Sequence, residues 1–106
     1  MLRVLLMLAL FSAIVLGSAP VAEHTIMQAN KTFSQSEITI KAGDKVVFKN
    51  DDQVTHNVFS TSKGFEFNLK TQAPGASAAV PFNGEGTAEI RCAIHPKMKL
   101  IVNIKR

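Results

Sequence analysis

Residues 87–105 read TAEIRCAIHPKMKLIVNIK and contain two runs of alternating apolar and polar residues, separated by a short loop that includes a proline. In an extended chain, successive side chains point to opposite faces, so the apolar positions of each run share one face. These positions are Ala88, Ile90 and Cys92 in the first run and Leu100, Val102 and Ile104 in the second. The stretch therefore predicts two β-strands, with Cys92 pointing inward where the first one ends.

The same alternation recurs upstream, in short segments divided by turn-forming residues. The predicted strands cover residues 23–30, 37–41, 46–48, 54–60, 78–82 and 87–92, with a last strand from Leu100. Glycine, asparagine and aspartate mark the connections, and the segments after residue 19 lack helical periodicity. Seven to eight short strands with this spacing are typical of an all-β fold, a sandwich or barrel with antiparallel pairing.

The first nineteen residues differ in composition from the rest. Arg3 precedes an almost entirely apolar run over residues 4–16, and small residues follow at 17–19. These are the three regions of a secretory signal peptide, and the run is short of the roughly 20 residues that a membrane span needs. We therefore predict a signal peptide over residues 1–19, either cleaved at an unassigned bond near its end or kept as an anchor, and one domain over 20–106.

Composition narrows the classes of function. The chain has 106 residues and a formal net charge of +4, from twelve Lys and Arg against eight Asp and Glu. These charges are spread along the chain rather than gathered in runs, which argues against a nucleic-acid partner. The sequence shows neither a paired-carboxylate nor a Ser–His arrangement, so we expect that the protein is not an enzyme. We also expect a monomer that meets a membrane only through residues 1–19.

The loop between the last two predicted strands carries three metal-ligand side chains. His95 lies three positions after Cys92, and Met98 lies three positions after His95. A thiolate, an imidazole and a thioether together suit copper, whereas calcium and magnesium prefer oxygen ligands and zinc sites rarely include methionine. A trigonal copper site with a weak axial methionine needs two histidines, so one ligand must come from elsewhere in the chain.

Two other histidines, His24 and His56, are candidates for that ligand. His56 follows a turn in the middle of the chain, from which it can approach the sheet end that carries Cys92. His24 lies near the start of the domain, where an exposed strand histidine is the simpler interpretation. We therefore predict His56 as the fourth ligand. Cys92 is the only cysteine, and in an exported protein an unpaired cysteine needs a metal, a reaction or a partner chain to explain it.

Several segments of the chain resemble the cupredoxins, the small blue copper proteins. The similar segments are ITIKAGD at 38–44, VFKN at 47–50, THNV at 55–58, GT at 86–87 and CAIHPKM at 92–98. The ligand loop is most similar in length to that of amicyanin, followed by plastocyanin and pseudoazurin. The resemblance covers nearly all of residues 23–106 and implies a cupredoxin-like Greek-key β-sandwich that binds one type 1 copper ion.

The resemblance also implies roles for individual residues. His56, Cys92 and His95 would be the equatorial copper ligands and Met98 the axial one, while Asn57 would tie the two ligand loops together by hydrogen bonds. The implied function is to carry single electrons between redox partners in the periplasm by Cu(I)/Cu(II) cycling. The alternative is copper storage or delivery with the same site.

Two expectations concern the surroundings of these ligands. Ile94 stands where amicyanin has a proline, so it keeps an N–H that we expect to donate a hydrogen bond to the Cys92 sulfur and to raise the reduction potential. We also expect an apolar surface patch around His95, with lysines beside it that favour a transient contact with an acidic redox partner. The patch residues are Ile94, Pro96 and Val54, and the lysines are Lys97 and Lys99.

Overall fold

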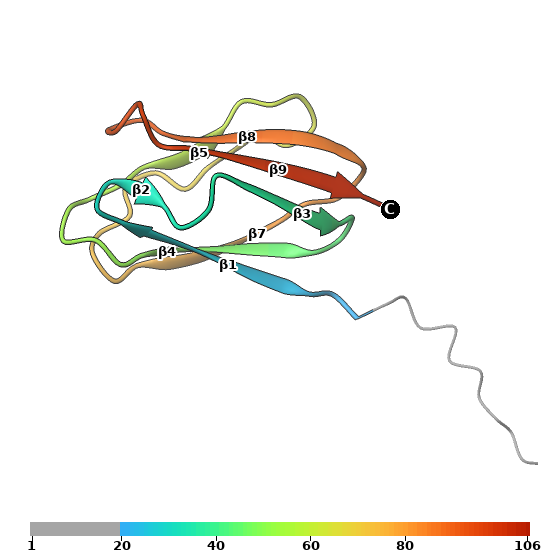
Figure 1. Ribbon diagram of the computed structural model, residues 1–106, viewed down its shortest axis with the longest axis horizontal. Helices are drawn as coiled ribbons and strands as arrows, with labels where there is room; N and C mark the ends of the chain where they lie inside the picture. Colours follow the sequence, from blue (N-terminus) through green and yellow to red (C-terminus); the bar gives the residue numbers. More distant parts are fainter. Residues whose placement is uncertain (1–19) are drawn as a thin grey trace, which may run out of the picture.

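The computed structural model describes residues 20–106, which form two β-sheets packed face to face (Figure 1). The signal peptide predicted over residues 1–19 lies outside the described residues. Among residues 20–106, no helix is long and apolar enough to cross a membrane. The all-β sandwich predicted from the alternating segments is confirmed.

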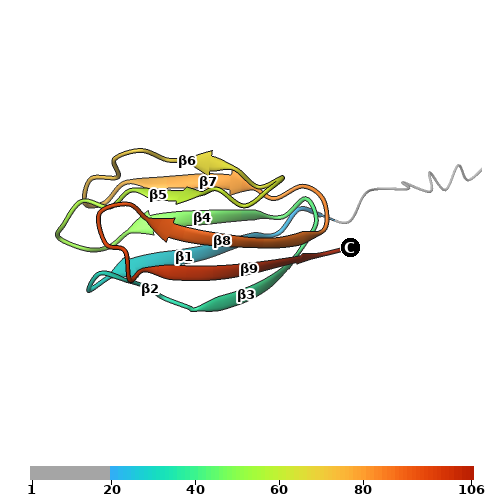
Figure 2. The ribbon, with the colours of Figure 1, turned by 90° about the horizontal axis from the view of Figure 1, so that it is seen from above.

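The strands divide between a four-stranded and a five-stranded sheet. The first has the order β2–β1–β4–β7, with β1 (Glu23–Ala29), β2 (Thr32–Phe33), β4 (Lys45–Asn50) and β7 (Ser77–Pro81). The second has the order β3–β9–β8–β5–β6, with β3 (Glu37–Lys41), β5 (Val58–Ser60), β6 (Phe67–Asn68), β8 (Gly86–Cys92) and β9 (Lys99–Lys105). Figure 2 shows the strands of the second sheet side by side. The described residues thus form nine strands rather than seven to eight, and the two strands that the prediction lacks, β2 and β6, are only two residues long.

The antiparallel pairing predicted for the sandwich is wrong for two strand pairs. β1 runs parallel to β4, and β3 runs parallel to β9, while the other paired strands are antiparallel. Between β1 and β4 the chain crosses to the opposite sheet to form β3, and it returns in the direction of β1. Alternation tells which face of a strand is buried, and it carries no information on the direction of the neighbouring strand.

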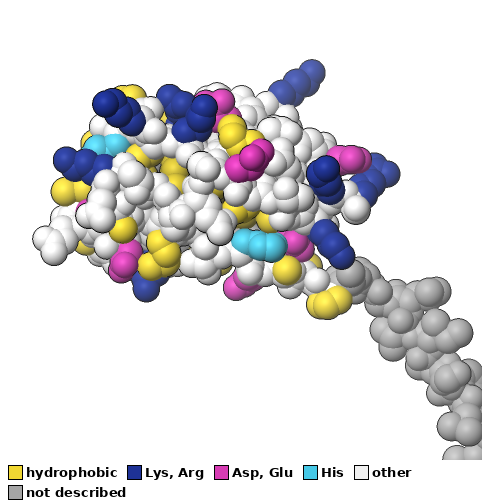
Figure 3. Space-filling view, viewed as in Figure 1, with side chains coloured by type: hydrophobic (Ala, Val, Ile, Leu, Met, Phe, Trp, Pro, Cys, Tyr) yellow, Lys and Arg dark blue, Asp and Glu magenta, His cyan; other side chains and the backbone are white. Residues whose placement is uncertain are grey.

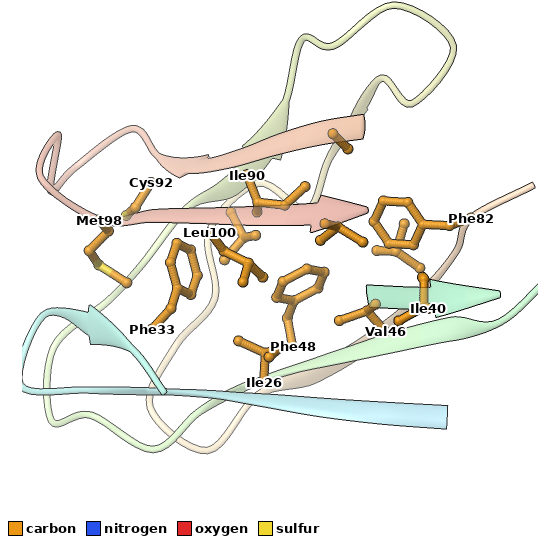
Figure 4. Close-up of a cluster of buried hydrophobic side chains, with 14 of the residues drawn as sticks. Ile26, Phe33, Ile40, Val46, Phe48, Phe82, Ile90, Cys92, Met98 and Leu100 are labelled. Carbon is orange, nitrogen blue, oxygen red and sulfur yellow. The ribbon is translucent and has the colours of Figure 1, made fainter. Parts of the chain in front are cut away.

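The core lies between the sheets, and Phe48 occupies its middle (Figure 4). The ring of Phe48 is completely buried, with its centroid 6.4 Å from that of Phe33 and 5.9 Å from that of Phe67. The buried side chains of β8 and β9 are those predicted from the alternation of the last stretch, namely Ala88, Ile90, Cys92, Leu100, Val102 and Ile104. Cys92 and Met98 lie at one end of this core.

The strand predicted over residues 54–60 is correct only in its last part, because β5 begins at Val58. The preceding residues are held in a turn by the buried side chain of Asn50. Its Nδ2 donates to the carbonyl of Val54 at 2.9 Å, and its Oδ1 accepts from the amide of Asp52 at 2.9 Å.

The two ligand loops, residues 51–57 and 93–98, meet at one end of the sandwich. This end lies opposite the one at which the described chain begins and ends (Figures 1 and 2).

Candidate metal centre

Strand pairing brings the two ligand loops together. β5 pairs with β8 so that Val58 lies opposite Cys92, which leaves His56 just beyond the end of that ladder. The main chain of His56 also forms two hydrogen bonds with that of Gln72. The His56 amide nitrogen lies 3.1 Å from the Gln72 carbonyl oxygen, and the Gln72 amide nitrogen lies 2.7 Å from the His56 carbonyl oxygen. His56 is thus fixed by main-chain bonds on a loop, although it lies outside a regular strand.

Three donor atoms converge at this end of the core. His56 Nδ1 lies 3.7 Å from Cys92 Sγ and 3.0 Å from His95 Nδ1, and His95 Nδ1 lies 3.8 Å from Cys92 Sγ. Their ligand atoms form the only group of three or more His, Cys, Asp or Glu side chains suited to a metal ion among residues 20–106. The residues predicted from the sequence are therefore brought together, with Nδ1 as the inward nitrogen of both imidazoles.

Burial differs among the predicted ligands. His56, Cys92 and Met98 are almost completely buried, whereas His95 is half-buried and lies nearest the surface. The amide of Met98 donates to the carbonyl of His95 at 2.9 Å, which folds the loop back after Pro96 and returns the Met98 side chain to the core. Figure 4 shows Met98 and Cys92 at the same end of the core, beside Phe33.

Electrostatics favour a neutral imidazole at His95. Burial is the main cause that holds the pKa of His95 below its ordinary value, and repulsion from His56 and Lys31 adds to it, while Asp52 offsets part of the effect. The unprotonated form dominates at neutral pH, because the ordinary histidine pKa is already about 6.5. The lone pair of a ring nitrogen is then available to a metal ion.

Asn57 ties the two loops together, as the resemblance implied, but it does so through its main chain. Its N–H donates to Cys92 Sγ at 3.3 Å, and its carbonyl accepts from the amide of Ala93 at 3.0 Å. The predicted hydrogen bond from the Ile94 amide to this sulfur is wrong. Among the hydrogen bonds of residues 20–106, the Cys92 sulfur accepts from the Asn57 amide and receives none from Ile94. The pairing of Val58 with Cys92 places Asn57, the residue just before β5, next to the sulfur.

The surface beside His95 is partly apolar, as predicted. Ile94 is 52% exposed, and with His95 and Pro96 it lines a hollow of about 290 Å³ that Lys31 and Lys97 complete. Val54 and the predicted Lys99 are exposed as well, but neither lines this hollow, and Lys31 takes the place expected of Lys99. Figure 3 shows Lys and Arg side chains beside a histidine at this end of the molecule.

His24, the other candidate for the second imidazole, lies at the opposite end of the sandwich. Its Nε2 is 2.9 Å from Asp44 Oδ2, and it lines a separate hollow with Lys41 and Lys105. The hydrogen bond from His24 is the main cause that holds the pKa of Asp44 below its ordinary value, together with the amides of Lys41 and Ala22. His24 is therefore part of a structural contact, and the choice of His56 agrees with the structure.

Two supporting residues were missed by reasoning from the sequence. Arg91 donates from its guanidinium to the carbonyl of Pro96 at 2.9 Å and to Glu89 at 3.1 Å, so it clamps the ligand loop to β8. Asp52 Oδ2 lies 3.0 Å from Nε2 of His56. The four-residue spacing of Asp52 and His56 was visible in the sequence, but only the turn that Asn50 stabilises makes it a contact.

The donor set fits a copper ion. A point equidistant from Cys92 Sγ and the two Nδ1 atoms lies about 2 Å from each of them, close to the metal–nitrogen and metal–sulfur bond lengths of about 2.0 to 2.3 Å in protein sites. Two imidazoles and a thiolate with a buried thioether nearby are the ligands of a trigonal copper site. His56, Cys92, His95 and Met98 are thus positioned to form a type 1 copper site.

A β-sandwich that gathers these donors at one end defines a copper protein of the cupredoxin class. Comparison with known proteins agrees, because residues 21–105 match the model of the copper binding proteins of the plastocyanin/azurin family. The chain belongs to this family. It is 32% identical over 84 residues to amicyanin-alpha of Methylorubrum extorquens, a match that covers 76% of this chain and 71% of that protein.

Solved structures share the fold at lower identity. A purple cupredoxin from Nitrosopumilus maritimus superposes with a TM-score of 0.69 at 23% identity, covering 77% of this chain and 99% of that one. A copper-containing nitrite reductase from Thermus scotoductus gives a TM-score of 0.74 at 21% identity, covering 84% of this chain but 23% of the enzyme chain. The same sandwich therefore occurs as a free protein and as a part of a larger enzyme.

Proposed function

We propose that this protein carries single electrons with one type 1 copper ion held by His56, Cys92, His95 and Met98. The observation that carries the proposal is the triangle formed by Cys92 Sγ and the two Nδ1 atoms, with sides of 3.0, 3.7 and 3.8 Å. In this assignment the triangle supplies the equatorial ligands, and Met98 supplies the weak axial one. A bound copper ion would supply one-electron chemistry by alternating between Cu(I) and Cu(II).

The scaffold suits electron transfer because it limits movement of the ligands. His56 is held by main-chain bonds to Gln72, and Cys92 ends a strand that is paired on both sides. The Asn57 main chain and the Arg91 guanidinium fix the loop that carries His95. Electron transfer is fastest when the site changes little between oxidation states, and a site held in this way meets that condition.

A titration of the purified chain with Cu(II) tests this function. We expect an intense blue or purple absorption that saturates at one copper per chain, disappears on reduction and returns on oxidation, with a reversible one-electron voltammogram. Storage or delivery of copper would instead be indicated by metal exchange with a soluble chelator within seconds and by an irreversible voltammogram. A chain that binds Cu(II) without colour would contradict the proposal.

We propose that His95 is the exit point for the electron and that the hollow beside it is the docking surface. His95 is the ligand nearest the surface, and Ile94 and Pro96 present apolar area around it. Lys31 and Lys97 place positive charge at the rim, which favours an acidic redox partner in a transient complex. The protein would act as a monomer in such an encounter.

The rim lysines are expected to set the rate of electron transfer with a charged reagent. With the hexacyanoferrate anion as oxidant, the double variant Lys31→Gln/Lys97→Gln should react roughly tenfold more slowly at low salt, because electrostatic steering accelerates association by about ten- to a thousandfold. The difference should shrink as ionic strength rises, since charges farther apart than about 8 Å are screened at 0.15 M salt. Stopped-flow spectroscopy of the copper band measures the rate.

Two lysines at the opposite end of the sandwich provide the control. Lys41 and Lys105 line the hollow near His24, so Lys41→Gln/Lys105→Gln removes the same two charges far from His95 and should leave the rate nearly unchanged. Equal slowing by the two changes would show that net charge alone matters and that the rim does not guide docking.

We further propose that the protein is exported to the periplasm by residues 1–19 and is a carrier rather than an enzyme. The charged start, apolar run and small residues at 17–19 support export. An oxidising compartment is also where a lone cysteine is best explained by a bound metal. A carrier role is supported by the match to amicyanin-alpha over most of both chains, in contrast to the 23% of the nitrite reductase chain that is covered.

A further inference from the structure

The side of His56 that faces away from the metal site contacts a carboxylate. Asp52 Oδ2 lies 3.0 Å from His56 Nε2, and the His56 side chain is completely buried while that of Asp52 is 13% exposed. The two residues are four positions apart on the loop between β4 and β5. The imidazole is therefore held between the donor triangle on its Nδ1 side and a nearly buried carboxylate on its Nε2 side.

The carboxylate of Asp52 is held in place by its own hydrogen bonds. Oδ2 accepts from the amide of Lys31 at 2.8 Å, Oδ1 accepts from the amide of Gln53 at 2.9 Å, and the Asp52 amide donates to Asn50 Oδ1 at 2.9 Å. An aspartate is ordinarily ionised at neutral pH, so the side chain is an acceptor with a fixed orientation.

The amide of Lys31 reaches Asp52 because of an unusual turn. Asn30 and Lys31 have φ angles of 52° and 57°, in the left-handed region that non-glycine residues seldom adopt. Two such residues in succession form the tight turn that suits a β-hairpin, here between β1 and β2. The hairpin thus supports the metal site through one main-chain N–H.

This contact decides which ring nitrogen of His56 carries the proton. An ionised carboxylate offers only acceptors, so His56 Nε2 must be the donor. The neutral ring then has its lone pair on Nδ1, the atom 3.7 Å from Cys92 Sγ and 3.0 Å from His95 Nδ1. A histidine that binds a metal commonly donates its other N–H to a carboxylate or carbonyl, which orients the ring and makes it a stronger donor.

We propose that Asp52 is a positioning residue that selects the tautomer of His56 and lowers the reduction potential of the copper site. The part on the potential rests on the proposed function. The negative charge behind the ring strengthens His56 as an electron donor, which favours Cu(II) more than Cu(I). The Lys31 amide supports this arrangement by fixing the carboxylate.

The first test compares two aspartate variants of the copper-loaded protein. Asp52→Asn keeps an oxygen that can accept from Lys31 and His56 but removes the charge, and we expect Cu(II) to bind about 10- to 100-fold more weakly. Because Cu(I) binding should be less affected, the reduction potential should rise by up to about 59 mV for each tenfold loss of Cu(II) affinity. Asp51→Asn removes the neighbouring charge, whose exposed carboxylate has no hydrogen bond to the described residues, and it should leave the potential nearly unchanged. Equal potentials in the two variants would overturn the proposal.

The second test needs no copper. Nitrogen-15 NMR of the copper-free chain reports which His56 nitrogen is protonated, and we expect protonated Nε2 in the wild type and a mixture of tautomers in Asp52→Ala. Protonated Nδ1 in the wild type, or the same tautomer in both proteins, would overturn the proposal whatever the copper measurements show. A wild type that forms no coloured copper complex would contradict the proposed function instead and leave the tautomer result standing.

Discussion

Replacing Cys92 with serine is expected to abolish the intense visible absorption of the copper-loaded protein. Cys92 is the only cysteine in the chain, so no other thiolate can replace it, and charge transfer from thiolate to copper is the source of that colour in the proposed site. The hydroxyl of serine does not ionise at neutral pH and is a harder ligand than a thiolate, so the loss of Cu(II) affinity should exceed the 10- to 100-fold expected for a supporting residue. Visible spectroscopy and chelator competition measure the two effects.

The matched control replaces a histidine outside the site. His24→Gln removes a metal-binding side chain from the same domain, but His24 contacts Asp44 at the opposite end of the sandwich, so colour and affinity should remain. Copper-free Cys92→Ser should stay folded, because serine has nearly the size of cysteine and the Asn57 amide can donate to its oxygen. Retained colour in Cys92→Ser would contradict the assignment of the thiolate as a ligand.

Replacing Phe48 with alanine is expected to destabilise the copper-free protein by about 3–5 kcal/mol, the usual loss for a large buried aromatic side chain. Phe48 is completely buried and packs near Phe33 and Phe67, so its removal leaves a cavity between the sheets. Chemical unfolding followed by far-UV circular dichroism measures the change, since the chain has neither Trp nor Tyr as a fluorescent probe. Copper should recover part of the stability, because a ligand that binds only the folded state stabilises it.

Phe59 is the matched control for this change. It follows the buried Val58 on β5, points to the other face of the strand and is only half-buried. Phe59→Ala removes the same kind of ring and should lower the free energy of unfolding by about 1 kcal/mol. The half-buried Phe59 ring buries less apolar area on folding, and its removal leaves a space that is open to solvent. Similar losses for the two variants would show that Phe48 is not the centre of the core.

The final stretch of the sequence shows how far local patterns reach. The alternation before and after the ligand loop identified both strands and all six of their buried apolar positions, because the side-chain period of two depends only on local chain geometry. The equal spacing of Cys92, His95 and Met98 likewise pointed to copper, since the chemistry of a donor set is a property of residue types. His56 was predicted with the help of the expected fold.

The errors lie where two distant segments meet. The pairing of β1 with β4 is parallel, and the sulfur of Cys92 accepts from Asn57, 35 positions away, rather than from its neighbour Ile94. Strand direction and hydrogen-bond partners across a sheet depend on which segments become neighbours in space. An alternating pattern carries no record of that choice.

The amino-acid sequence by itself therefore determined the class of fold, the buried faces of the last two strands and the chemical identity of the metal-binding side chains. Only the tertiary structure decided that both histidines present Nδ1, that the Asn57 amide contacts the Cys92 sulfur and that Asp52 lies behind His56. The physical reason is that periodicity and ligand chemistry are local properties. The orientation of a ring and the protonation of its nitrogens are set by neighbours that only the packing of two sheets brings within 3 to 4 Å.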